Sequence, residues 1–86
     1  MKIRMFILGD APEMRDIQEL GDRIKETSDI EIEVLDIETR EGKEVAEVYD
    51  IYATPSLLVT TDDGAVINSW IGKVPAEFEL KNVIYA

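Results

Sequence analysis

Hydrophobic residues in the first third of the chain follow two different patterns. Lys2 to Leu8 is a mostly apolar run, which is typical of a strand buried on both faces inside a sheet. After Pro12 the apolar residues recur every three to four positions, at Met14, Ile17, Leu20 and Ile24. This spacing predicts a helix with one buried stripe, and Thr27 to Asp29 would end it.

The start of this helix lies between Gly9 and Glu13, and two caps fit it. Asp10 can accept from the free amides of the first turn, with Glu13 three residues later as its capping-box partner. Alternatively, Ala11 is the cap and Pro12 occupies the first helical position, where no N–H is needed. In both cases we expect the helix to begin within a residue or two of Pro12.

Strict alternation marks the next strand. Ile30, Ile32 and Val34 are predicted to face the core, while Glu31 and Glu33 face water. Carboxylates along a strand also suit a sheet edge, because charge discourages pairing with other chains. The strand is completed by Leu35 to Ile37.

A second helix is indicated after this strand. Thr39 is a good cap for a helix that runs to about Tyr49, with Val45, Val48 and Tyr49 pointing inward. This helix is weaker, since Gly42 costs about 1 kcal/mol relative to alanine in a helix interior. Asp50 is expected in the turn that follows.

The segment from Tyr49 to Val59 joins that helix to a strand that opens with Pro55. Proline has no N–H for a sheet ladder, so it is tolerated at the first residue of a strand, at an edge or at a bulge. It also pushes Thr54 toward extended geometry. A Thr-Pro step that begins an apolar strand is a candidate cis bond, although only about 5–6% of X-Pro bonds are cis. The alternative is that Pro55 merely shapes the loop.

The last third of the chain predicts a hairpin and a short helix. Leu57–Thr61 and Ala65–Trp70 are β-rich and flank Asp62-Asp63-Gly64, and an Asp-Gly step between two such runs is a strong hairpin signal. Ile71-Gly72 ends the second strand. A final helix starts at Val74-Pro75-Ala76, and its residues available for packing are Phe78, Leu80, Val83 and Ile84.

The order of elements is therefore β-α-β-α-β-β-α. A βαβ unit forms a right-handed crossover between parallel strands, and the hairpin adds antiparallel strands. We expect an α/β fold with a four-stranded mixed sheet and helices on both faces, in a single domain over residues 1–86.

Charge and composition narrow the classes of function. Nine basic and nineteen acidic residues give a net charge of −10, which argues against binding to nucleic acid or to an anionic membrane surface. No run approaches the ~20 apolar residues of a membrane span, and nothing at the N-terminus resembles a signal peptide. A cytoplasmic protein is the expectation.

The absence of cysteine and histidine limits the chemistry further. Disulfide exchange needs a thiolate, and a serine site has no histidine base in this chain. No cofactor is implied. Several carboxylates might hold a hard cation but lack the spacing of a Ca²⁺ loop, so a solvated surface is the preferred interpretation, and these are Asp36, Glu38, Asp62 and Asp63.

The order of elements and two short motifs resemble the thioredoxin-like superfamily. Its first helix starts at a Cys-Pro-x-Cys motif, where this chain has Ala11-Pro12-Glu13-Met14, with the proline present and both cysteines replaced. Its cis-proline matches Pro55 in Ala53-Thr54-Pro55-Ser56-Leu57. The resemblance implies a thioredoxin-like fold without redox activity, so we expect no enzyme.

A narrower resemblance is to the KaiB family, thioredoxin-related regulators of the circadian ATPase KaiC. Gly9-Asp10-Ala11-Pro12 is similar to that family's Gly-Asn-Thr-Pro turn, and Val34-Leu35-Asp36-Ile37 to its Val-Ile-Asp-Val. The Asp62-Asp63-Gly64 hairpin departs from that family, which tends to be proline-rich there. The resemblance implies regulation of a RecA-type ATPase.

These observations predict a platform that binds a protein partner. The residue before a cis-proline keeps its backbone N–H and C=O exposed, which lets thioredoxin relatives pair an extended peptide as an added strand. The candidate binding residues are Gly9, Asp10, Ala11, Pro12, Ala53, Thr54, Pro55, Ile71 and Gly72. Two alternatives remain: an enzyme or glutathione-binding protein that works without cysteines, and a designed or reconstructed scaffold with no partner.

Overall fold

The computed structural model describes residues 1–9, 12 and 14–86 of the chain. Within these residues the elements follow the order predicted from the sequence. They are β1 (Lys2–Ile7), α1 (Met14–Thr27), β2 (Glu31–Asp36), α2 (Arg40–Val48), β3 (Ser56–Thr60), β4 (Val66–Ile71) and α3 (Glu77–Ile84).

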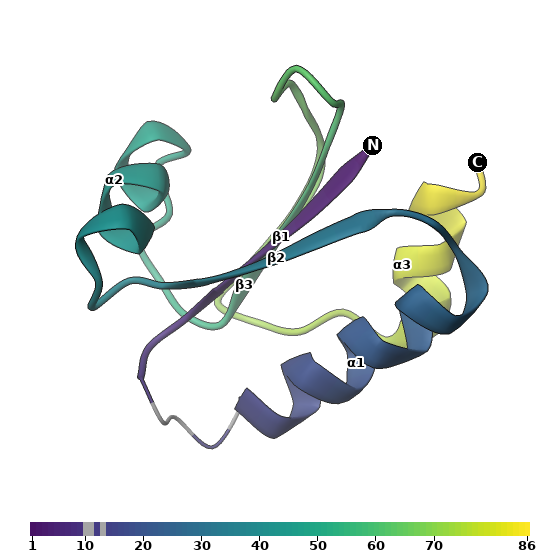
Figure 1. Ribbon diagram of the computed structural model, residues 1–86, viewed down its shortest axis with the longest axis horizontal. Helices are drawn as coiled ribbons and strands as arrows, with labels where there is room; N and C mark the ends of the chain where they lie inside the picture. Colours follow the sequence, from purple (N-terminus) through teal and green to yellow (C-terminus); the bar gives the residue numbers. More distant parts are fainter. Residues whose placement is uncertain (10–11, 13) are drawn as a thin grey trace.

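The strands form one mixed sheet with the spatial order β2-β1-β3-β4. β1 and β2 are parallel, as a connection through α1 requires, and β3 is antiparallel to both β1 and β4. Figure 1 shows α1 and α3 on one side of the strands and α2 on the other. The predicted fold class, a four-stranded mixed sheet with helices on both faces, is confirmed.

The larger hydrophobic core lies between the sheet and the helices α1 and α3. The predicted stripe of α1 is confirmed, because Ile17, Leu20 and Ile24 are buried there and Met14 packs against them. From the sheet, this core takes Ile3, Met5, Ile7, Leu57, Val59 and Trp70, and from α3 it takes Leu80. Burial of β1 on both faces follows, since Phe6 lies in the opposite core.

The smaller core lies under α2, around Phe6, Leu35, Ala46 and Leu58. The predicted N-cap is confirmed, because the Thr39 hydroxyl accepts a hydrogen bond from the Gly42 N–H at 3.0 Å. The prediction that Val48 points inward is wrong, since its side chain is 77% exposed. The buried stripe passes through Gly42 and Ala46, and two residues beyond Ala46 a helix has turned by roughly 200°, away from the sheet.

Two further predictions of burial are wrong. Val34 is 44% exposed, because β2 is an edge strand that β1 flanks on one side only, whereas Ile32 packs against the larger core. Phe78 is 67% exposed, because it lies two positions from the buried Leu80 and therefore on the outer side of α3. Val83 is half-buried and packs against the larger core, as expected.

The predicted turns are confirmed. Asp50 follows α2 with a φ of 56°, in the left-handed region that aspartate tolerates better than most residues. The β3–β4 hairpin closes through Thr61 N–H to the Ala65 carbonyl at 2.8 Å, and Gly64 has a φ of 97°. A shift in register near Val59 marks a bulge in this hairpin.

A helix that crosses a bilayer must be both long and apolar, and none in the described part of the chain meets this requirement.

Candidate functional site

The predicted binding residues lie around one end of the sheet. β1 ends just before Gly9, β3 begins just after Pro55, and β4 ends just before Gly72. The register places Ser56 opposite both Phe6 of β1 and Ile71 of β4, so these three strands reach the same end. We refer to this end, bordered by Gly9, Ala53–Pro55 and Ile71–Gly72, as the Pro55 end of the sheet.

Ser56 holds two of these segments together. Its hydroxyl donates to the Ala53 carbonyl at 2.6 Å and accepts from the Gly72 N–H at 3.1 Å, and the side chain is fully buried. A Cβ added at Gly72, where φ is 76°, would lie 3.5 Å from the Ala53 Cβ. Ala53 and Gly72 are therefore neighbours. The sequence analysis did not single out Ser56 as a site residue, although a hydroxyl directly after a strand-opening proline was the available signal.

Thr54 and Pro55 form the middle of this end. Pro55 is buried, Ala53 and Thr54 are half-buried, and the Thr54–Pro55 peptide bond is cis. Within the described part of the chain, the backbone of Thr54 makes no backbone hydrogen bond. Its N–H and C=O are therefore not committed to the sheet.

The turn after β1 is organised by a carboxylate of β2. One oxygen of Asp36 accepts from the Gly9 N–H at 3.2 Å and from the Glu38 N–H at 2.8 Å. Gly9 has a φ of 51°, and a Cβ there would lie 3.3 Å from a Glu38 carboxylate oxygen. These contacts give Asp36 a structural role in holding the turn.

The other members of the predicted site differ in what the structure describes. Pro12 is exposed, whereas Asp10 and Ala11, as well as the Glu13 of the proposed capping box, lie outside the described residues. Among the residues that are described, no group of three or more acidic side chains gathers as a metal site would require. Asp62 instead pairs with the N-terminal ammonium, which lowers the pKa of its carboxyl.

The surface beside the Pro55 end carries exposed apolar side chains. Tyr52, two residues before Thr54, is 85% exposed, and Leu8, next to Gly9, is also exposed. Neither can act as an acid or base near neutral pH, because a tyrosine hydroxyl has an ordinary pKa of about 10. The groups available there are therefore suited to binding by backbone pairing and apolar contact.

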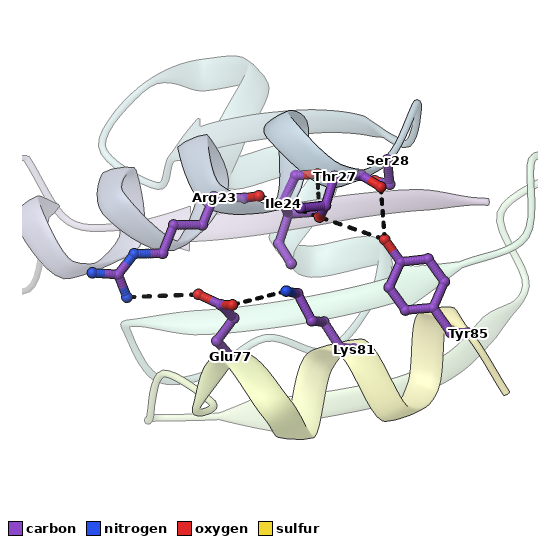
Figure 2. Close-up of polar contacts among 7 residues, drawn as sticks. All are labelled: Arg23, Ile24, Thr27, Ser28, Glu77, Lys81 and Tyr85. Atoms are coloured by element: carbon purple, nitrogen blue, oxygen red, sulfur yellow. Dashed lines mark hydrogen bonds and ion pairs between the residues drawn. The ribbon is translucent and has the colours of Figure 1, made fainter.

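A crevice of about 450 Å³ lies elsewhere, between α1 and α3. Figure 2 shows the contacts that cross from one helix to the other beside it: Arg23 to Glu77 at 3.6 Å, and the Tyr85 hydroxyl to the Thr27 carbonyl at 2.9 Å. Lys81 donates to the same Glu77 carboxylate at 2.9 Å and lowers the pKa of that group. These contacts fasten α3 to α1, and the crevice contains none of the predicted binding residues.

Comparison with known proteins identifies the fold. No protein-family model matches the sequence, and no curated protein is significantly similar to it. Thioredoxin 1 from the thermophilic eubacterium Thermosipho africanus is 20% identical, with a TM-score of 0.71 over 99% of this chain and 91% of that chain. A variant thioredoxin from Halobacterium salinarum is 18% identical, with a TM-score of 0.80 over 95% and 69%. Thioredoxin O2 from Arabidopsis thaliana is 15% identical, with a TM-score of 0.76 over 98% and 71%. At these identities the match concerns architecture alone, and the chain has a thioredoxin-like fold without any cysteine.

Proposed function

We propose that this chain is a non-catalytic module that binds a protein, and that an extended segment of the partner lies along the backbone of Thr54. The observation that carries the proposal is that the N–H and C=O of Thr54 make no backbone hydrogen bond within the described residues, while the buried Pro55 and β3 hold them in position. Backbone groups held in this way can pair with an extended peptide as an added strand. The chain holds no cysteine, so the proposal involves no thiol step.

The surroundings of Thr54 suggest which peptides would bind. Ala53 and Gly72 are small neighbours, so a partner backbone can approach closely beside them. Tyr52 offers a large exposed ring for an apolar side chain of the partner. The net charge of −10 disfavours acidic segments. We therefore propose an extended, neutral or basic segment with at least one apolar side chain.

A narrower form of the proposal is KaiB-like regulation of a RecA-type ATPase. It rests on the resemblance of the segments around Pro12, Asp36 and Pro55 to that family. The test is binding of the purified protein to the KaiC-like ATPase of its own organism, with and without nucleotide. If no complex forms in either condition, the narrower form is wrong and the general proposal is unaffected.

The general proposal is tested by affinity capture from the native lysate, followed by measurement of affinity for the captured partner. The bait variant is the double substitution Pro12→Glu and Thr54→Arg, which adds a carboxylate and blocks the loop backbone. The matched control is Phe78→Glu, an equally drastic change at an exposed position on α3. We expect wild type and the control to bind the partner and the double variant to lose it.

A half-buried Thr54 makes a folding control necessary. Pro12→Glu alone changes an exposed residue, so it retains the fold if the double variant does not. In wild type, binding should shift the amide resonances of Gly9, Thr54 and Gly72. A partner that binds the folded double variant as tightly as wild type would overturn the proposal.

A further inference from the structure

The β4 edge of the sheet is open. In the sheet of described strands, β4 is paired with β3 on one side and has no strand on the other. Its residues from Val66 to Ser69 are all exposed. Such an edge presents a row of unpaired backbone groups and is a template for another strand.

The chemistry of β4 differs from that of the opposite edge. β2 carries Glu31, Glu33 and Asp36, and charges of this kind discourage pairing. By contrast, no charged residue occurs between Gly64 and Gly72, although charged residues make up 33% of the chain. The β4 edge therefore lacks the protection that β2 has.

One amide of β4 is demonstrably outside the ladder with β3. The N–H of Ser69 donates to the side-chain oxygen of its neighbour Asn68 at 2.8 Å. This is a local substitute for a strand partner, because both groups are exposed and belong to adjacent residues. A second strand could take over this N–H, with release of the Asn68 side chain to water.

We propose that β4 pairs with β4 of a second copy of this chain, antiparallel and about a two-fold axis, so that two sheets become one continuous sheet. A two-fold contact brings each surface against itself, and a neutral strand is the place where two chains of charge −10 can approach most closely. Antiparallel pairing also brings the Lys73 that follows each strand toward the Asp62–Asp63 turn that precedes the other. Opposite charges then meet at both ends of the contact.

The size and charge of the contact determine how the dimer should behave. The bulge near Val59 shortens the regular part of β4, so the interface is small and the dimer is expected to be weak and in rapid exchange. Repulsion between two chains of charge −10 is long-ranged at low salt, where the Debye length is about 30 Å at 0.01 M, and short-ranged at 0.15 M, where it is about 8 Å. Self-association should therefore strengthen several-fold as salt is added over this range.

Sedimentation equilibrium of the whole chain, from micromolar to millimolar concentration, tests the proposal. Ser69→Pro removes an N–H that β3 does not use and prevents an edge from pairing, so it should leave the monomer folded and weaken self-association roughly tenfold or more. Ser69→Lys places like charges near the two-fold axis and should have the same effect, and it retains the backbone N–H if the proline variant does not fold. Val34→Lys, at an exposed position on the β2 edge, is the control and should dimerise as wild type does.

Three results would overturn the proposal: a wild type that stays monomeric to millimolar concentration, a dimer that survives in folded Ser69→Lys, or a dimer that is lost in Val34→Lys. Because Ser69 lies outside the Pro55 end, the same variants should bind the partner of the proposed function unchanged. The two proposals can therefore fail separately.

Discussion

Replacing Gly42 by alanine sets helix propensity against tertiary packing. Propensity alone predicts that alanine stabilises α2 by about 1 kcal/mol. In the structure, however, a Cβ at this position would lie 2.0 Å from the carbonyl oxygen of Asp36 and 2.6 Å from its carbonyl carbon. Both are backbone atoms at the end of β2, so α2 and the strand would have to separate by roughly 1 Å or more to reach ordinary contact distances.

This separation is costly because the same carbonyl anchors the start of α2. It accepts hydrogen bonds from the N–H of Thr39 at 3.0 Å and from the Thr39 hydroxyl at 2.7 Å. Loss of one such bond costs about 0.5–1.5 kcal/mol, and overpacking costs typically about 1–3 kcal/mol. After the gain in propensity is subtracted, we expect Gly42→Ala to lower the free energy of unfolding by roughly 1–3 kcal/mol.

Gly21 in α1 is a matched control within the same chain. It is also a buried helical glycine, but a Cβ there would lie 3.7 Å from the Met5 Cε and 3.9 Å from the Ile32 Cγ2, both ordinary contacts. Gly21→Ala should therefore keep its gain in propensity and raise the free energy of unfolding by up to about 1 kcal/mol.

Equilibrium unfolding in urea measures both variants, with circular dichroism and the fluorescence of the buried Trp70 as independent probes. The expected result is a change of opposite sign at the two glycines. If Gly42→Ala proves as stable as wild type or more stable, the close approach of α2 to the end of β2 is not what constrains this position, and the reasoning is refuted.

Three further predictions follow from the described contacts. Ser56→Ala removes both hydrogen bonds of a fully buried hydroxyl, so the free energy of unfolding in urea should fall by roughly 1–3 kcal/mol; a neutral substitution would contradict this role. Leu80→Ala should cost about 2–5 kcal/mol in the same assay, whereas Val48→Ala should stay within about 0.5 kcal/mol; equal losses would refute the assigned faces of α2 and α3. Lys81→Met should raise the pKa of Glu77 in an NMR titration, since the Lys81 hydrogen bond is the main cause of its lowering. A lowered pKa means that the stabilising contribution of Glu77 is present above the ordinary glutamate pKa and is lost as pH falls through the lowered value; an unchanged titration of Glu77 in the variant would contradict the assigned cause.

Local signals in the sequence were sufficient for the elements and their order. The spacing of apolar residues located α1, because its stripe packs directly against the sheet and every member contributes to one core. The Thr39 cap and the Asp63-Gly64 turn were equally readable, since each acts through hydrogen bonds or backbone angles within a few residues. The candidate site was located by the same means, through the proline that opens β3.

Only the tertiary structure decided which faces are buried and why Gly42 is glycine. Val48 and Phe78 are as apolar as buried residues, and their exposure depends on where α2 and α3 meet the sheet, which a helical pattern of eight or nine residues leaves open. The role of Ser56 likewise requires Ala53 and Gly72 to be neighbours, and these lie 19 positions apart in the chain. Local preferences act over one or two turns of backbone, whereas burial and close approach arise from contacts between segments that meet only after folding.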